Sequence, residues 1–204
     1  MKSRGAKAFT TASALITYSE KSLRDLVRDH SGNGARTAVS DDSDLRTRQR
    51  ELLESIVALL PPEKSSFPIN FLCCLLRAAI FLGAASTCKI ELEKRISAIL
   101  EHVTVDDLLV VSFTYDGERL FDLESVRRII SGFMEKEKSV AVFNAGDFRE
   151  VSSTAMLRAA KTVDAYLGEI ATFSELSISK FNGIAILVPK AARKVDDDVY
   201  RAVD

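Results

Sequence analysis

The 204-residue sequence contains no tryptophan, four prolines and three cysteines, and each scarcity excludes something. Few prolines leave room for long helices, because proline inside a helix removes a hydrogen bond and clashes with the preceding turn. Three cysteines are an odd number without a spaced framework, which argues against a disulfide scaffold and favours a reducing compartment. A net charge of −1 gives no basic footprint for nucleic acid. We expect one helical domain spanning 1–204, long enough to bury a sizeable core.

Signatures of catalytic and cofactor sites are missing as well. The sequence has neither the G-x-x-x-x-G-K-[ST] nor the G-x-G-x-x-G motif of phosphate-binding loops. Cys73 and Cys74 are adjacent, and adjacent side chains on a helix point about 100° apart, so the two do not converge on one metal ion. His102 ends an amphipathic stretch, where an imidazole simply favours the helix dipole. We predict a non-enzymatic protein with no metal or cofactor.

The strongest structural signal lies in residues 67–109. Residues 67–83 are apolar on every side, with Arg77 as their single charge, and residues 88–103 are amphipathic. A helix that is apolar all round lies at the centre of a protein and needs other helices around it. An internal arginine and flanking Pro and Gly suit a core helix better than a membrane span. The region therefore predicts a packed core whose function lies on the surfaces around it.

The rest of the chain predicts more helices and few extended segments. Polar and glycine-rich residues predict a flexible loop over 30–48. Residues 110–117 end in an Asp-Gly turn signal without a second strand to follow, so we interpret them as a crossover loop, and 138–147 as irregular. Helical periodicity covers 6–29, 49–60, 122–135, 150–171 and 177–189, and a last helix opens near 196 and is truncated at 204. The predicted fold class is all-α, a stack of antiparallel helical hairpins.

Several blocks, in this order, carry a family resemblance. The sequence resembles the helical domain of the plant non-phototropic hypocotyl and root-phototropism-like family of BTB adaptors at 75–79, 88–96, 105–109, 160–170, 176–181 and 197–203. That family places a BTB domain before this region and a variable tail after it, and we expect this chain to be a fragment lacking both. Its fold is then expected to resemble the helical region that follows BTB domains in other ubiquitin-ligase adaptors.

The resemblance implies a signalling adaptor. Its BTB domain would recruit a cullin-based ubiquitin ligase, and its helical domain would bind receptor kinases of the phototropin type, in the cytoplasm or peripherally at the plasma membrane. An alternative is a structural spacer or self-association module, with recognition carried elsewhere in the full-length protein. Residues 1–50 hold 10 Lys/Arg against 6 Asp/Glu, which suits an acidic partner or an anionic lipid surface, or else a solvated helix face and loop.

Four side chains are candidates for contact or modification. Tyr166 and Tyr200 lie within the blocks that resemble the family, and a tyrosine on an amphipathic helix has the alternative role of a half-buried core residue. Ser40 and Ser43 fall in the predicted loop, where phosphorylation would add negative charge.

Overall fold

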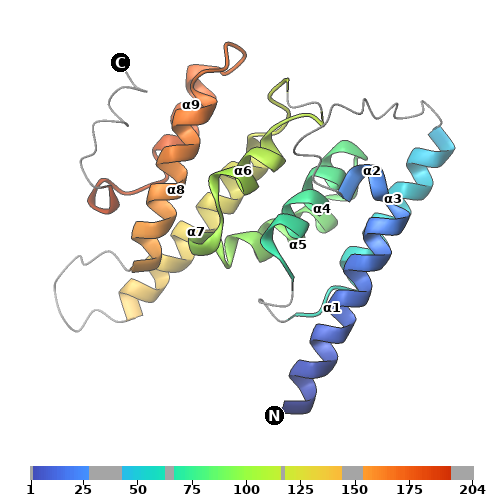
Figure 1. Cartoon of the computed structure of the whole chain (residues 1–204). Coiled ribbons are helices and arrows are strands. Elements are labelled where there is room, and N and C mark those ends of the chain that lie inside the picture. Colours follow the sequence, from blue (N-terminus) through green and yellow to red (C-terminus); the bar gives the residue numbers. More distant parts are fainter. Residues whose placement is uncertain (1, 28–42, 63–66, 116–117, 144–153, 194–204) are drawn as a thin grey trace. The chain divides into compact units, whose positions relative to one another are not determined.

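The computed structural model of the chain describes residues 2–27, 43–62, 67–115, 118–143 and 154–193 (Figure 1). These residues form helices joined by turns, with no β-sheet among them, which confirms the all-α class. Contacts between backbone positions divide the chain into two compact units, Met1–Arg95 and Ile96–Asp204. Each unit has its own buried core and is described separately.

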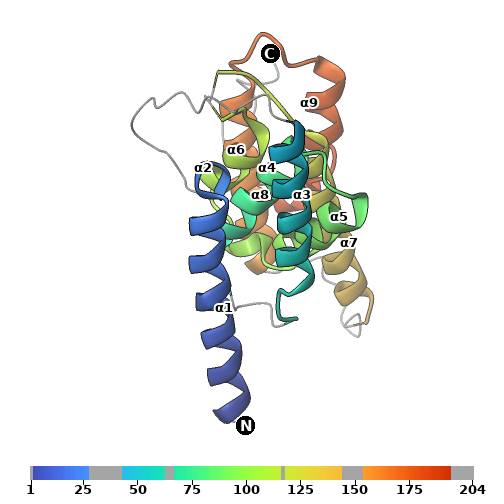
Figure 2. The ribbon, with the colours of Figure 1, turned by 90° about the vertical axis from the view of Figure 1, so that its right-hand side faces the viewer.

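In the first unit, α4 is the central element. Every residue from Phe71 to Ala79 is buried, as the apolar sequence around Arg77 predicted. Helices α2 and α3 both pack against α4, and α1 lies beside α3 (Figure 2). The elements of this unit are α1 (Lys2–Ser22), α2 (Arg24–Val27), α3 (Ser43–Ala58), α4 (Ile69–Phe81) and most of α5 (Ser86–Ser97), whose last two residues belong to the second unit.

Helix α4 ends at a glycine that its backbone geometry requires. Gly83 has a φ of 67°, the left-handed conformation that a side chain disfavours. Its N–H donates to the Ile80 carbonyl at 3.1 Å, and the Ala84 N–H donates to the Ala79 carbonyl at 2.9 Å. This pair of bonds is a Schellman motif, which satisfies carbonyls that the helix end would otherwise leave unpaired.

In the second unit, α7 and α8 carry most of the packing. Helix α8 packs against η1, α6, α9 and η2, and α7 packs against η1, α6 and α9. Their inward faces include Phe133 and Tyr166, two of the largest fully buried side chains in the described residues. The elements are η1 (Leu100–His102), α6 (Val105–Ser112), α7 (Glu124–Phe143), α8 (Thr154–Ile170), α9 (Ile178–Ala185) and η2 (Lys190–Ala192).

The crossover-loop interpretation of 110–117 is wrong in its first part. Helix α6 continues to Ser112, because a capping box between Thr104 and Asp107 starts it and the burial of Val111 holds its last turn. Phe113 then pairs with Leu120 in an isolated antiparallel bridge. A partner for the extended segment therefore exists, but it is one residue long. Residues 116–117 lie outside the described part.

Two other boundaries also differ from the sequence prediction. Helix α3 begins at Ser43, so residues 43–48 are not loop, and 28–42 lie outside the described residues. The Arg46 guanidinium explains the early start, since it lies 5.0 Å from the centre of the Phe81 ring and donates to the Phe81 carbonyl. Helix α7 continues to Phe143, so 138–143 are helical rather than irregular. Elongating an existing helix fixes one residue per added bond, which outweighs the β-branched valines there.

The first predicted helix, 6–29, is interrupted at Leu23, where α1 ends and the short α2 begins. One turn earlier, the buried Ser19 hydroxyl donates to the Leu15 carbonyl at 2.7 Å. Such a bond back to the preceding turn is known to bend helices. The helices predicted over 150–171 and 177–189 are present as α8 and α9, each somewhat shorter. The truncated helix predicted near 196 lies outside the described residues.

Substitutions of three glycines by alanine are expected to have opposite effects. Gly168 in α8 and Gly183 in α9 have space for a Cβ, with no atom within 4 Å of it. Each Gly→Ala change should raise the free energy of unfolding by about 0.5–1 kcal/mol, because alanine has less conformational entropy to lose. Gly83→Ala should lower it by about 1–2 kcal/mol because of its positive φ. Urea unfolding followed by circular dichroism measures all three, and a Gly83→Ala protein as stable as the other two would contradict this account.

Candidate interaction surfaces

The described residues contain no cluster that would support catalysis by a metal. No group of three or more His, Cys, Asp or Glu side chains among them is arranged to hold an ion. Cys73, Cys74 and Cys88 are all buried and unbridged, as core cysteines commonly are. No helix in the described ranges combines the length and apolarity needed to cross a membrane.

The cysteines are expected to be unreactive while the chain is folded. Burial first, and the negative charge of Glu54 second, raise the pKa of Cys88 from 9.0 to about 11. Two pKa units correspond to about a hundredfold less thiolate, the reactive form, at neutral pH. We expect iodoacetamide to label the three thiols only as fast as the chain unfolds. Because the pKa is raised in the folded state, the stability from this group is complete below pH 9 and falls as the pH rises towards 11. Rapid native labelling of Cys88 at pH 8 would contradict this expectation.

Tyr166 is a core residue rather than a surface contact. Its side chain is fully buried on α8, and its hydroxyl lies 2.7 Å from the Ser112 hydroxyl on α6. Ser112 donates its own proton to the Leu108 carbonyl at 2.7 Å, so Tyr166 is the donor to Ser112. Burial raises the pKa of Tyr166 well above its ordinary value. The alternative role considered for this tyrosine, as a core residue, is therefore the one the structure supports, and burial is more complete than expected.

The roles of the other three candidate residues remain predictions. Ser43 is exposed as the first residue of α3, and a phosphate there would meet the favourable end of the helix dipole. Ser40 and Tyr200 lie outside the described residues.

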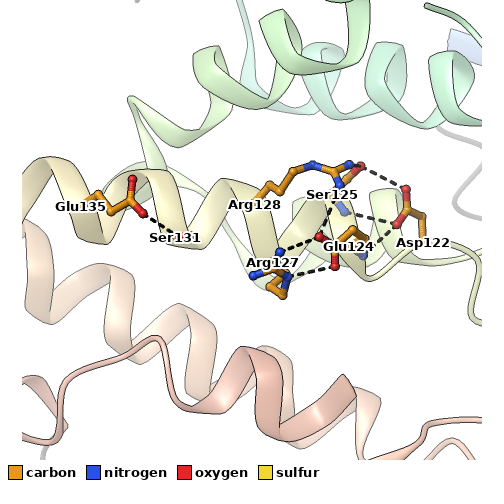
Figure 3. A network of polar contacts seen from close by, with 7 residues as sticks. All are labelled: Asp122, Glu124, Ser125, Arg127, Arg128, Ser131 and Glu135. Atoms are coloured by element: carbon orange, nitrogen blue, oxygen red, sulfur yellow. Dashed lines mark hydrogen bonds and ion pairs between the residues drawn. The ribbon is translucent and has the colours of Figure 1, made fainter. Parts of the chain in front are cut away.

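A stripe of polar side chains runs along one side of α7 (Figure 3). Its members are spaced by three or four residues, so they share one side of the helix. Arg127 makes two bonds to the Glu124 carboxylate, at 2.6 and 2.9 Å, and Arg128 lies 3.4 Å from the same carboxylate. Further along, Ser131 donates to Glu135 at 3.4 Å. The stripe presents two half-exposed guanidinium groups that share one carboxylate.

Asp122 fixes the start of this helix. Its carboxylate accepts the backbone N–H of Glu124 at 2.8 Å and that of Ser125 at 3.2 Å, and also the Ser125 hydroxyl at 3.0 Å. The same serine oxygen accepts a bond from Arg128 at 3.1 Å. The N-terminal cap thus positions Arg128 of the stripe through a buried serine.

Breaking the ion pairs of the stripe should cost little stability. The Arg127 guanidinium holds the pKa of Glu124 below its usual range. The stabilisation from this ion pair is therefore complete above the usual pKa of a glutamate, and it is lost as the pH falls through the lowered pKa. Both side chains are about half exposed, and exposed ion pairs contribute below about 1 kcal/mol. We expect Glu124→Gln to reduce the free energy of unfolding by less than about 0.5 kcal/mol in 0.15 M salt, and Asp122→Ala by about 1 kcal/mol. Thermal unfolding of both variants measures the two losses. A larger loss for Glu124→Gln than for Asp122→Ala would contradict this expectation.

Helix α9 exposes the second feature, an apolar ridge that we define as Ile178 and Ile186. Their side chains are 79% and 78% exposed, the highest values among the large apolar residues that the structure describes. Phe181 and Ile184 of α9 are buried, as is Val188 just beyond the end of the helix. The sequence predicted both isoleucines to be helical, but periodicity alone does not tell which apolar residues of so short a helix are exposed.

Polar contacts at both ends hold α9 in place. At its start, the Ser177 hydroxyl accepts the Lys180 N–H at 3.4 Å. Beyond its end, Arg193 donates to the Ala185 carbonyl at 2.7 Å and lies 3.2 Å from the Asp164 carboxylate on α8. Burial raises the pKa of Asp164, and the charge of Arg193 counteracts this. The isoleucines are therefore exposed on a helix with a fixed position against α8.

Comparison with known proteins identifies the class of the chain. The model of the NPH3 family matches residues 1–204. The chain is 66% identical over its full length to Root phototropism protein 2 of Arabidopsis thaliana, and it covers 35% of that protein. It is also similar to the BTB/POZ domain-containing proteins SR1IP1 (36% identical, 33% covered) and SETH6 (34% identical, 34% covered) of the same plant. No solved structure matches the chain.

The chain belongs to the NPH3 family, as the resemblance of its helical blocks predicted. It spans about a third of the length of these relatives.

Proposed function

We propose that this chain is the partner-binding helical part of a signalling adaptor in phototropism. The observation that carries the proposal is its 66% identity, over its whole length, to a root phototropism protein. Further support comes from relatives that carry a BTB/POZ domain, a class of domain that acts through protein–protein contacts. The absence of a metal-binding cluster in the described residues is compatible with binding rather than catalysis.

In this proposal the chain binds receptor kinases of the phototropin type, and a BTB/POZ domain elsewhere in the full-length protein recruits a cullin-based ubiquitin ligase. The adaptor works in the cytoplasm, at the periphery of the plasma membrane. Packed helices hold the polar stripe of α7 in a fixed arrangement, so that recognition needs little ordering of the surface. Two arginines that share one carboxylate suit an acidic segment of the receptor, since a second carboxylate or a phosphate could join them.

The test is direct binding of the purified chain to the purified cytosolic part of a phototropin-type receptor, measured by biolayer interferometry. We expect a dissociation constant in the micromolar range and no binding to the cytosolic part of an unrelated receptor kinase. Absence of binding at about 100 µM would overturn the proposal. If the chain failed to bind the receptor and formed dimers in sedimentation experiments, the self-association alternative would replace the proposal.

A pair of variants tests whether the α7 stripe carries this recognition. Arg127→Glu together with Arg128→Glu reverses two charges on the stripe, and Lys136→Glu together with Lys138→Glu reverses two exposed charges further along the same helix. We expect the first pair to weaken receptor binding at least about tenfold and the second to change it less than about threefold. Equal effects would mean that net charge alone, and not the stripe, determines binding.

A further inference from the structure

The two arginines of the α7 stripe converge on one anionic group (Figure 3). Arg127 donates two bonds to the Glu124 carboxylate, at 2.6 and 2.9 Å, and the Arg128 guanidinium lies 3.4 Å from one of the same oxygens. Two N–H groups of one guanidinium on two oxygens of one acid form the bidentate geometry with which arginine also binds phosphate. The Glu124 carboxylate therefore marks a position at which this helix holds an anion.

The charges in direct contact at this position are unequal. Two guanidinium groups carry two positive charges, and the Glu124 carboxylate carries one negative charge. The carboxylate of Asp122, the other acid of this cluster, is engaged by two backbone N–H groups and by the Ser125 hydroxyl. A phosphate monoester carries a charge of about −1.5 to −2 at neutral pH and has three strong acceptor oxygens. It therefore matches the arginine pair better than a single carboxylate does.

A phosphate can reach this position without refolding of the helix. The side chains of Glu124, Arg127 and Arg128 are 41–53% exposed. Exposed ion pairs contribute little stability, so displacing the Glu124 carboxylate from the arginines costs little. The Ser125 oxygen also holds Arg128, at 3.1 Å, which reduces the ordering of that side chain that binding requires.

We infer that Arg127 and Arg128 recognise a phosphorylated side chain of the receptor, with the phosphate taking the place of the Glu124 carboxylate. The inference rests on the proposed function, because it requires the chain to bind a receptor kinase through the α7 stripe. Phosphorylation of the receptor would then switch on its binding to the adaptor. Glu124 would disfavour unphosphorylated segments, because it occupies both arginines until a more highly charged anion displaces it.

Two forms of the same receptor test the inference. The purified cytosolic part of a phototropin-type receptor is phosphorylated by its own kinase activity with ATP, and half of the sample is then treated with a phosphatase. In biolayer interferometry we expect the chain to bind the phosphorylated form at least about tenfold more tightly. Equal binding of the two forms would overturn the inference and leave the proposed function intact. Absence of binding by either form at about 100 µM would contradict the proposed function itself.

Substitutions in the chain test where the phosphate binds. Glu124→Gln removes the competing carboxylate, so we expect it to tighten binding of the phosphorylated form about threefold or more. Glu169→Gln removes an exposed carboxylate from α8 and should change binding less than about 1.5-fold. Arg127→Lys together with Arg128→Lys keeps both charges but loses the planar forks, and should reduce the preference for the phosphorylated form to below about threefold. Circular dichroism checks that each variant is folded.

Three results from these variants and from vesicles would overturn the inference. Equal effects of Glu124→Gln and Glu169→Gln would mean that net charge, and not the arginine pair, sets the affinity. A preference for the phosphorylated receptor that survives both lysine substitutions would mean that the phosphate binds elsewhere. Vesicles that contain a phosphatidylinositol phosphate give the third: if they bind through the same arginines while the two receptor forms bind alike, the ligand is a lipid headgroup.

Discussion

A chain carrying Tyr166→Ala is expected to lose about 3–5 kcal/mol of unfolding free energy, the largest effect that we predict. The side chain is fully buried on α8, and its removal leaves a cavity that the neighbouring helices fill only in part. Since small domains are stable by about 5–15 kcal/mol, this loss would remove a large fraction of the stability of the second unit. Urea unfolding followed by circular dichroism measures it, and a loss below about 1.5 kcal/mol would show that the core around α8 is loosely packed.

Smaller changes at the same contact separate packing from hydrogen bonding. Tyr166→Phe keeps the ring and removes the donor to Ser112, which still has its own bond to the Leu108 carbonyl. We expect a cost of about 1 kcal/mol. Ser112→Ala should cost more, about 1–3 kcal/mol, because it leaves the buried tyrosine hydroxyl without a partner. The double variant should be more stable than the sum of the two losses predicts, and strict additivity would exclude the hydrogen bond.

Arg95→Met is the second large effect, with an expected loss of about 2–4 kcal/mol. The Arg95 guanidinium donates to the carbonyls of Leu60 and Pro61, at 3.0 and 2.5 Å, and to Glu91 at 2.7 Å. It therefore ties the chain just beyond α3 to α5 within the first unit. Methionine has a similar length but no donors, so both carbonyls lose a charged partner in a mostly buried position.

Two control variants separate the effect of the geometry of the Arg95 guanidinium from the effect of its charge. Lys94→Met removes an exposed charge one residue away and should change stability by less than about 0.5 kcal/mol. Arg95→Lys keeps the charge but lacks the planar fork that reaches three acceptors, so it should recover less than half of the loss. Chemical unfolding of the three proteins under one salt condition makes the comparison. Full recovery by lysine would mean that charge, and not geometry, holds the two segments together.

The sequence predicted those parts of the fold in which burial and period agree. Helix α4 could be predicted because its nine buried residues, Phe71 to Ala79, are apolar in the sequence apart from Arg77. Helix α8 could be predicted because Met156, Val163 and Ile170 recur every seven residues. Prediction failed where local preference and tertiary contact disagree. The valines near 110 favour an extended segment, but the capping box that begins six residues earlier starts α6, and the helix continues through them. The contact between Arg46 and Phe81 joins residues far apart in sequence, and no local pattern contains it.

Candidate surface residues were harder to predict than the helices that carry them. A single sequence places Tyr166 on an amphipathic helix, but whether its hydroxyl reaches solvent depends on α6, which approaches from 54 residues away. The exposed isoleucines were predicted to be helical and were given no role, because a sequence alone does not tell which apolar residues of a short helix lack a neighbour. The polar stripe of α7 resembles any solvated helix face until its arginines are seen to share one carboxylate.

The position of Ser112 links an exposed part of the chain to a buried one. Its carbonyl accepts the backbone N–H of Phe121 at 2.6 Å, beside the bridge of Phe113 and Leu120, while its hydroxyl meets Tyr166 in the core. The Phe121 side chain is 40% exposed, yet its amide is closed off by this bond. Hydrogen exchange at that amide should consequently be slow for so exposed a residue, and it should quicken in step with any loosening around Tyr166. The exchange rate of this single surface amide would thus report how often the core of the second unit opens.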